Sequence, residues 1–352
     1  QVLTGIGTSG TVAAGSLLVT SISRSDSFAG LAQTMTVLGA AVMALPLASL
    51  TQRGGRRLAL VSGYSVGFIG AAFAVVGGVA KSLPLVLLGS LLVGAASASG
   101  YQARFAAIDL ATDENRSRNL SLVVWGSTVG AVMGPNLMEP AGNLAQFLHI
   151  PRLVGPYLIV GLCLALSSMV ISWFLRPDPY LTANVSSDGM TQKKHESTRV
   201  ALRHIRRTPR GLFAMSAVGI GHLAMVSIMV MTPVHMSHDE VTLSVIGLVI
   251  SVHVLGMFAF SPLVGSLSDR WGRVRVIQIG VVLLLAAAAV AGVSPAINAV
   301  SLGAGLFLLG LGWSCTLIAG STMLSESMSV EMRPSSQGAS DLMMNLLGAV
   351  GG

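Results

Sequence analysis

Charged side chains are scarce in this sequence of 352 residues, since aspartate, glutamate, lysine and arginine together make up only 10% of it. A soluble domain usually carries about 25%. Hydrophobic residues make up 52% of the chain, and the mean hydropathy is +0.75. The shortage of charge excludes an ordinary water-facing domain and indicates a protein embedded in a lipid bilayer.

Cysteine, lysine and aromatic residues are also few. The two cysteines, Cys163 and Cys315, lie in separate apolar runs, which excludes a disulfide framework and a cysteine metal site. All three lysines lie outside the apolar runs, so no retinal Schiff base is available within the membrane. Aromatic residues make up 5%, and no dedicated sugar-stacking site is evident.

Sequence signatures of enzymes are missing as well. The sequence has no P-loop, no histidine pair of the zinc type and no nucleophile elbow. We therefore do not expect an enzyme, and we expect no cofactor and no bound metal.

Long apolar runs fill most of the sequence. A membrane-spanning helix needs about 20 mostly apolar residues, and eleven runs of this kind are present. They cover residues 4–22, 28–50, 58–80, 84–108, 119–143, 154–175, 210–234, 242–264, 275–294, 298–322 and 335–352. The predicted fold class is all-α, a polytopic membrane protein.

Lysine and arginine are distributed unevenly among the connections between these runs. The even-numbered connections hold 17 of the 21, whereas the odd-numbered ones hold only Arg24, Lys81 and Arg152. Basic residues accumulate in cytoplasmic loops. We therefore expect a multi-pass protein of the cell (inner) membrane with its even-numbered loops in the cytoplasm. The net charge of +7 is spread over short loops, so it does not indicate a nucleic-acid partner.

The sequence also repeats itself at a shift of 217 residues, which aligns Arg53 with Arg270, Gly55 with Gly272 and Asp109 with Glu326. This pattern predicts a six-helix unit duplicated in parallel: a bundle at 1–176, a cytoplasmic linker at 177–208 and a second bundle at 209–352. The second bundle shows five of its six helices, so we expect a twelfth span in the native protein.

The linker at 177–208 has two readings. Its second part, residues 197–207, can form a basic amphipathic helix on the anionic inner leaflet. Alternatively, the whole stretch is a solvated linker. The sequence leaves both open.

A charged motif lies in the connection between the eighth and ninth runs. Residues 265–273 read GSLSDRWGR and match every fixed position of G-x-L-x-D-R-x-G-R. This stretch resembles the signature of the major facilitator superfamily. The earlier copy reads ASLTQRGGR, with Ala48 in place of the first glycine and Gln52 in place of the acid. The resemblance implies a transporter of two pseudo-symmetric helical bundles that rock about a central substrate site.

The motif also suggests a conformational latch. Glycines allow a tight turn, an aspartate can face the positive end of a neighbouring helix, and arginines can reach acids at adjacent helix ends. We expect the cluster to close the cytoplasmic side in the outward-facing state; the alternative is that these charges only enforce topology. The latch candidates are Gly265, Asp269, Arg270, Gly272, Arg273, Glu326, Arg53, Gly55, Arg56 and Asp109, with Arg273–Glu326 and Arg56–Asp109 as candidate pairs.

A second motif lies in the fifth run, GSTVGAVMGP at residues 126–135. Gly126, Gly130 and Gly134 recur every four residues and form one smooth helical face, and Pro135 kinks its end. This resembles the antiporter motif of the superfamily, which is found mainly in drug and proton exchangers. It favours export, while the alternative is ordinary small-residue packing.

Ionisable residues within spans are functional suspects, because burying charge in a bilayer is costly. Gln337, Asp341 and Asn345 follow one another at intervals of four and form a polar stripe in the eleventh run. A carboxylate in that position can exchange protons, so Asp341 is the first choice for proton coupling. The alternative is a structural hydrogen-bond hub.

Four further residues are candidates for the cavity. Arg104 and Tyr101 share a helical face in the fourth run; Arg104 is linked to proton coupling by the resemblance, or it snorkels to the interface or pairs with Asp109. His222 and His253 can titrate near neutrality, but a lone membrane histidine more often serves packing.

The combined prediction is a monomeric secondary active transporter that exports small amphipathic or lipophilic compounds in exchange for protons by alternating access. Its expected partners are a small-molecule substrate, protons and the lipid bilayer. The alternative is a proton-linked importer of a nutrient such as a sugar or organic acid.

Overall fold

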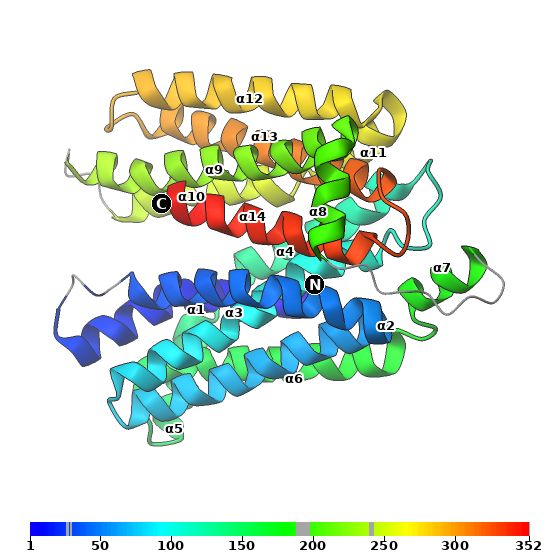
Figure 1. Cartoon of the computed structure of the whole chain (residues 1–352). Helices are drawn as coiled ribbons and strands as arrows, with labels where there is room; N and C mark the ends of the chain where they lie inside the picture. Colours follow the sequence, from blue (N-terminus) through cyan, green and yellow to red (C-terminus); the bar gives the residue numbers. More distant parts are fainter. Residues whose placement is uncertain (26–27, 29, 188–197, 239–242, 352) are drawn as a thin grey trace. The chain divides into compact units, whose positions relative to one another are not determined.

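The computed structural model describes residues 1–25, 28, 30–187, 198–238 and 243–351, and every regular element in these ranges is a helix (Figure 1). The first seven α-helices are α1 (Val2–Ser23), α2 (Leu31–Val79), α3 (Leu83–Ala106), α4 (Arg116–Asn136), α5 (Met138–Phe147), α6 (Gly155–Phe174) and α7 (Pro179–Ser187). The others are α8 (Thr198–Arg207), α9 (Pro209–His238), α10 (Leu243–Phe258), α11 (Ser261–Trp271), α12 (Arg273–Val293), α13 (Ala299–Glu326) and α14 (Arg333–Gly351), and the short 3₁₀ helix η2 spans Arg152–Val154.

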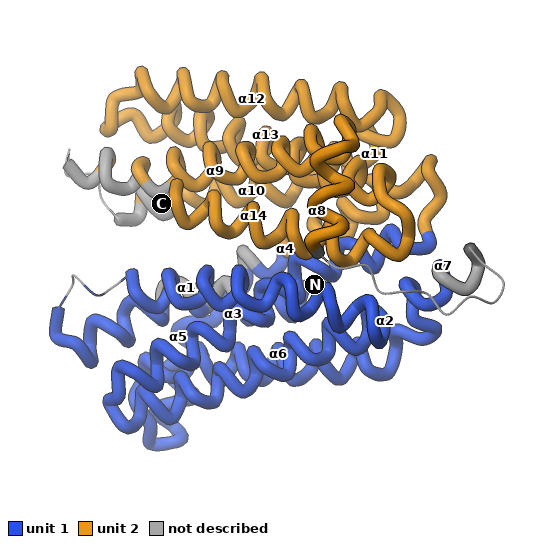
Figure 2. The backbone as a smooth tube through the Cα atoms, in the orientation of Figure 1, with its two compact units in different colours: residues 1–110, 129–195 blue, residues 111–128, 196–352 orange. Residues whose placement is uncertain are grey.

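The chain divides into two compact units (Figure 2). Unit 1 contains residues 1–110 and 129–195, and unit 2 contains residues 111–128 and 196–352. The first half of α4 therefore groups with the helices of the C-terminal half of the sequence. The division predicted from the sequence, 1–176, 177–208 and 209–352, stays a prediction, and residues 188–197 of its linker lie outside the described residues.

Unit 1 is held together by close contact of helix backbones. A Cβ added to Gly70 of α2 would lie 2.7 Å from the carbonyl oxygen of Gly89 in α3. Small residues at such positions let membrane helices pack closely. On another face of α2, Leu60 and Tyr64 join a buried apolar cluster with Leu164 of α6.

Unit 2 is also held together by close contact of helix backbones at glycines. A Cβ added to Gly280 of α12 would lie 2.9 Å from the carbonyl oxygen of Gly312 in α13, and the reverse substitution would produce the same distance. A buried apolar cluster that includes Val249 and Leu306 joins α10 to α13. The glycine abundance of the sequence thus serves helix packing in both units.

Within the described residues, seven helical segments are long and apolar enough to cross a membrane: Leu31–Val79, Leu83–Ala106, Arg152–Ala183, Pro209–Met229, Leu248–Trp271, Arg273–Val293 and Ala299–Glu326. The first of these has 49 residues, roughly 74 Å at the α-helical rise of 1.5 Å per residue, against a bilayer core of about 30 Å. It is interrupted at Gly55, whose φ of 84° and ψ of 174° are not helical. Its two parts match the predicted spans 28–50 and 58–80.

Two predicted spans are broken in the structure. The span predicted at 119–143 ends as α4 at Asn136 and restarts as α5 at Met138. Pro140 explains the break, because its ring excludes a helical bond to the carbonyl of Asn136. The span predicted at 242–264 is divided between α10 and α11, where Pro262 stands at the start of the second helix and has the same effect on the carbonyl of Phe258.

The predicted repeat has a direct structural counterpart. Gly55 and Gly272, which the shift of 217 residues aligns, are the two glycines with positive φ among the described residues, at 84° and 93°. Each stands immediately before a helical segment that begins with an arginine, Arg56 or Arg273. Only glycine adopts this backbone region readily, so the second glycine of each motif copy is required by the turn.

Candidate functional site

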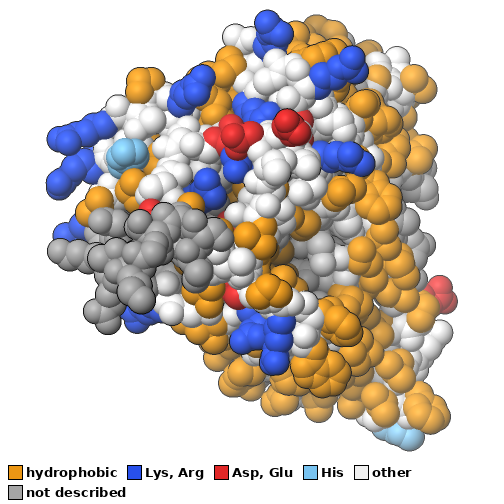
Figure 3. All heavy atoms as spheres, turned by 90° about the vertical axis from the view of Figure 1, so that its right-hand side faces the viewer, with side chains coloured by type: hydrophobic (Ala, Val, Ile, Leu, Met, Phe, Trp, Pro, Cys, Tyr) orange, Lys and Arg blue, Asp and Glu red, His pale blue; other side chains and the backbone are white. Residues whose placement is uncertain are grey.

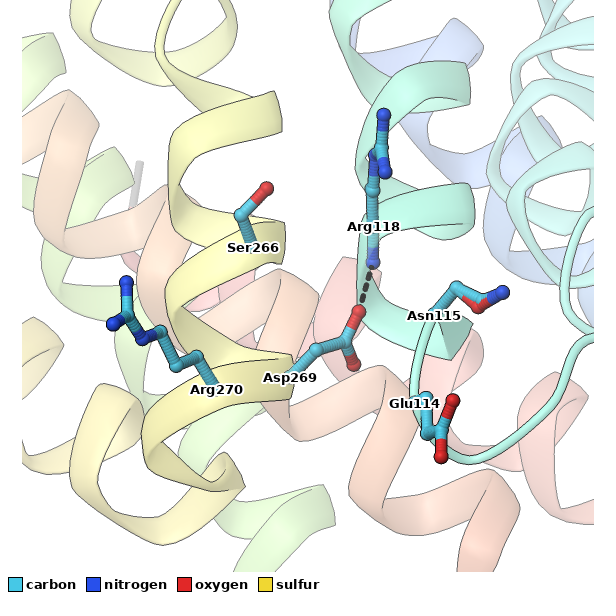
Figure 4. Close-up of a pocket in the computed structure, with 6 residues that line it drawn as sticks. All are labelled: Glu114, Asn115, Arg118, Ser266, Asp269 and Arg270. Carbon is cyan, nitrogen blue, oxygen red and sulfur yellow. Dashed lines mark hydrogen bonds between the residues drawn. The ribbon is translucent and has the colours of Figure 1, made fainter.

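Asp269 of α11 is bonded to the first turn of α4, and both residues lie in unit 2. Its Oδ1 accepts a hydrogen bond from the backbone N–H of Ser117 at 3.0 Å, and its Oδ2 accepts one from the N–H of Arg118 at 2.8 Å (Figure 4). The first N–H groups of a helix have no partner within the helix and carry partial positive charge. The carboxylate therefore satisfies two donors that the helix itself leaves unbonded and compensates the helix dipole.

Close packing of α11 on α4 makes this contact possible. A Cβ added to Gly265 would lie 2.7 Å from the carbonyl oxygen of Ser117 and would also collide with the side chain of Ser121. The hydroxyl groups of Ser117 and Ser268 are 2.9 Å apart, within hydrogen-bond distance. Glycine at position 265 is thus required by the approach of the two backbones, not by a special backbone angle.

Arg273 is the centre of a larger charged cluster, which we define as Asp269, Arg273, Glu326, Arg116 and Asp113. Its guanidinium lies 3.1 Å from Asp269 and 2.8 Å from Glu326, and it donates to the carbonyl oxygens of Asp113 and Ser268 at 2.7 and 2.9 Å. Arg116 lies 3.5 Å from Glu326 and 2.7 Å from the carboxylate of Asp113. The Arg273–Glu326 pair expected from the sequence is present in the structure.

The surface beside Asp269 is hollowed into an open depression of ≈ 420 Å³. Its lining, drawn in Figure 4, consists of Glu114, Asn115, Arg118, Ser266, Asp269 and Arg270. All six side chains are polar, and the space-filling view shows acidic side chains set among basic ones on this face (Figure 3). An open polar depression suits ionic contacts and offers no enclosure to a lipophilic compound.

Unit 1 contains the second expected ion pair. The Nε of Arg56 lies 2.7 Å from Oδ2 of Asp109 and its Nη2 lies 3.2 Å from Oδ1, so the contact is bidentate. Both side chains are buried, with 1% and 2% exposure. The guanidinium also lies over the rings of Phe105 and Tyr180, at 5.8 and 5.9 Å from their centroids. Arg53 of the same motif copy is exposed.

Asp178 is a structural residue that the sequence reasoning missed. Its carboxylate accepts hydrogen bonds from the backbone N–H groups of Arg56 and Arg57, at 3.2 and 2.8 Å, where the second part of α2 begins. It also accepts from the N–H groups of Tyr180 and Leu181 in the first turn of α7. The Asp-Pro pair at 178–179 is a typical helix start and was the available signal.

The polar stripe predicted on the eleventh span lies on a buried face of α14. Gln337, Asp341 and Asn345 are 0%, 1% and 5% exposed. The amide of Gln337 donates to the hydroxyl of Ser325 in α13 at 2.9 Å, and the amide of Asn345 donates to the backbone oxygen of Asp341 at 2.8 Å. The carboxylate is therefore withdrawn from solvent next to a polar row, a position that fits both a proton-exchanging group and a hydrogen-bond hub.

His222 is paired with a tryptophan. The indole N–H of Trp313 donates to Nδ1 of His222 at 3.0 Å. Because an indole can only donate, Nδ1 is the acceptor, and the neutral ring carries its proton on Nε2. This bond joins α9 to α13 within unit 2.

His253 has the opposite tautomer. It is fully buried, and its Nδ1 lies 2.8 Å from the carbonyl oxygen of Leu306, which can only accept. Nδ1 therefore carries the proton, and the ring connects α10 to α13.

Arg104 of unit 1 is buried among aromatic rings. It is 2% exposed and lies 4.6 Å from the ring centroid of Phe105 and 5.8 Å from that of Tyr101. Asp109, which the sequence offered as one possible partner, has both carboxylate oxygens bonded to Arg56. Cation–π contacts with Tyr101 and Phe105 are one part of the environment of this arginine.

The glycines of the second motif lie on α4. Gly126, Gly130 and Gly134 are all buried. A Cβ added to Gly130 would collide with the backbone of Gly5 in α1, within unit 1. The helix ends at Asn136, one residue after Pro135. The small face of this motif is thus used for close backbone contact.

The comparisons with known proteins cover all or nearly all of the chain. A family model described as Major Facilitator Superfamily matches residues 1–352. The uncharacterized MFS-type transporter YddS of Bacillus subtilis is 34% identical over 355 residues, which cover 100% of this chain and 81% of that protein. The riboflavin transporter RfnT of Brucella anthropi is 27% identical over 337 residues, 95% of this chain and 80% of that one. The crystal structure of the E. coli fucose:proton symporter FucP covers 100% of this chain and 98% of its own, with a TM-score of 0.66 at 14% identity, and so shows the likeness of the fold alone.

Proposed function

The chain belongs to the Major Facilitator Superfamily, and from that premise we propose that it exports small amphipathic or lipophilic compounds in exchange for protons. The observation that carries this proposal is the buried carboxylate of Asp341 in the polar stripe of α14. A carboxylate within a membrane helix is costly and marks proton or ion pathways in transporters. The glycine motif on α4 supports the direction of transport, because it resembles the motif of drug and proton exchangers.

Asp341 has the role of proton carrier in this mechanism. A proton arriving from outside neutralises the carboxylate, and its release to the cytoplasm restores the charge. The substrate senses or competes for that charge as the two bundles alternate in access. Gln337 and Asn345 flank the carboxylate along the helix, and their amides supply further polar groups on the same buried face.

Transport direction can be tested in proteoliposomes. Vesicles are equilibrated with a lipophilic fluorescent dye at equal concentration on both sides, and the outside is then acidified. An antiporter depletes the lumen of dye as protons enter, and the opposite gradient fills it; vesicles without protein show neither change. The gradient sets the direction, so the result does not depend on how the protein is oriented. Dye moving in the same direction as protons would contradict export.

A second candidate function is proton-linked import of a nutrient. The observation in its favour is the similarity to the riboflavin transporter RfnT, at 27% identity over 95% of this chain. The same vesicles loaded with riboflavin distinguish the two, because a symporter carries substrate into the lumen when the outside is acid.

We also propose that the charged cluster is the cytoplasmic latch. Its support is that Asp269, in the second copy of the repeat, bonds the first turn of α4, which belongs to the first copy. Contacts that join the two copies must break if the copies separate on this side. The alternative is that the charges only fix topology.

Neutralising Asp269 should shift the access equilibrium. Asp269→Asn removes the negative charge beside the first turn of α4 and removes the ion pair between residue 269 and Arg273. A helix cap or a charge at a helix end contributes about 1 kcal/mol, so we expect roughly a fivefold increase in the population open to the cytoplasm. Ser321 is buried, at 1% exposure. The measurement is the rate at which a membrane-impermeant maleimide labels the cysteine introduced as Ser321→Cys, in a chain that lacks Cys163 and Cys315.

The matched control for this variant is Glu114→Gln. Glu114 lines the same depression and is exposed, so its neutralisation makes the same charge change without removing the cap. If the labelling rate is the same in Asp269→Asn as in the parent chain, or rises as much in Glu114→Gln as in Asp269→Asn, the result would favour the alternative that these charges only fix the topology.

A further inference from the structure

The helix α8 carries an unusual concentration of positive charge. Within its ten residues, TRVALRHIRR, it has four arginines and no acid. Arg199, Arg203, Arg206 and Arg207 are all exposed, and no ion pair to any of them is found among the described residues. Four like charges on one short helix repel one another, and an external partner of negative charge would compensate this repulsion.

The arginines share one face of α8. At 100° per residue, Arg199, Arg203 and Arg206 follow one another at intervals of four and three and fall on the same side of the helix, with Arg207 at its edge. The opposite side is formed by Ala201 and Ile205, which are 0% and 1% exposed. We call the first side the arginine face. The buried contacts of the helix are made by the opposite side, and within the described residues no ion pair to the arginine face is found.

The apolar side of α8 fixes the helix to unit 2. It packs against α9 and α14, and its Ile205 approaches Gly211 of α9, where an added Cβ would lie 3.7 Å from the Cα of Ile205. Figure 1 shows α8 lying crosswise over the ends of α9 and α14. A helix held across the ends of membrane spans runs along the membrane surface.

The residues that follow α8 indicate how far the helix lies from the apolar core of the bilayer. α8 ends at Arg207, and the membrane-crossing segment of α9 begins at Pro209, with exposed apolar side chains at Leu212 and Phe213. The arginine face is therefore within a few residues of the apolar core of the bilayer. That is the level of lipid phosphates, and guanidinium groups pair with phosphate in bidentate geometry.

We propose that the arginine face of α8 binds the phosphate groups of anionic phospholipids in the cytoplasmic leaflet. Each basic side chain near an anionic surface contributes roughly a fivefold increase in affinity. The bound lipids hold α8 against the membrane and thereby fix the end of the linker that precedes α9. This inference does not depend on the transported substrate or on the direction of transport.

The test is a lipid titration of the full chain in detergent, followed by native mass spectrometry. Phosphatidylglycerol is compared with phosphatidylcholine for the parent chain and for the triple variant Arg199→Gln, Arg203→Gln, Arg206→Gln. We expect the parent to prefer phosphatidylglycerol and the variant to bind it on the order of 100-fold more weakly. The matched control is Arg24→Gln, Lys81→Gln, Arg275→Gln, which removes three exposed charges elsewhere and should retain the preference.

Thermal unfolding provides a second readout that does not depend on counting lipids. Phosphatidylglycerol should raise the melting temperature of the parent and of the control above their lipid-free values, but should not raise that of the α8 variant above its own. Equal affinity for the two lipids, or an equal loss in the control, would overturn the proposal. So would displacement of the lipid by millimolar inorganic phosphate, because the face would then recognise the free anion.

Discussion

Asp109→Ala should lower the free energy of unfolding by about 3–5 kcal/mol. Its partner Arg56 is 0% exposed, and the two bonds to Asp109 compensate its charge. Removing the carboxylate leaves a buried guanidinium without its anion, whereas the gain of the intact pair over two apolar residues is small. The measurement is chemical or thermal unfolding of the purified protein in detergent, followed by circular dichroism.

Two controls make this prediction specific. Asp113→Ala removes an acid whose side chain is 86% exposed and whose partner is Arg116, so it should cost less than about 1 kcal/mol. The double variant Arg56→Leu, Asp109→Leu removes both buried charges and should recover most of the stability lost in the single variant. A single variant no less stable than the parent would show that the buried ion pair contributes nothing to stability.

Asp341→Asn should abolish transport driven by a proton gradient and spare transport down a substrate gradient. The substitution preserves size and leaves intact the bond from the amide of Asn345, which is made to the backbone oxygen of residue 341. What it removes is the group that we propose takes up and releases the proton. In dye-loaded proteoliposomes, gradient-driven movement should fall to the level of vesicles without protein, while dye exchange without a gradient persists.

The conservative variant Asp341→Glu should restore part of the coupled transport, because it keeps a titratable carboxyl group on the same helix face. Glu139→Gln is the matched control, since it neutralises an exposed acid on α5 and should leave coupling unchanged. A hydrogen-bond hub would behave differently: Asp341→Asn would then retain gradient-driven transport, and any loss would be shared by transport down a gradient.

Local features of the structure could be predicted from the sequence. The glycines at 55 and 272 adopt positive φ, and the pairs Arg56–Asp109 and Arg273–Glu326 form, because each depends on a tight turn and a neighbouring helix end. The buried face of α14 could be predicted for a similar reason, since a polar stripe of period four cannot face lipid. For the two glycines and the α14 stripe, residue spacing along one element decides the geometry, whereas the two ion pairs join residues 53 positions apart and were indicated by the repeat of the motif.

Features that depend on distant packing could not be predicted. The sequence indicated that Asp269 faces a helix start, but the identity of that helix, α4, follows from the approach of Gly265 to Ser117 and Ser121, about 150 residues away. The bond from Trp313 to His222, which fixes the tautomer, joins residues 91 positions apart. Asp178 was missed because a polar loop was treated as a linker, although it caps two helical segments.

The central claim is that substrate and protons move in opposite directions through this protein, and substrate-evoked proton movement tests it most directly. Proteoliposomes with a pH-sensitive dye in the lumen and no imposed gradient receive a panel of lipophilic dyes and drugs from outside. The account predicts that at least one compound makes the lumen more alkaline with the parent chain and none does so with Asp341→Asn. A lumen that becomes more acidic in response to substrate entry, or one whose pH is the same with and without protein for every compound, would contradict it.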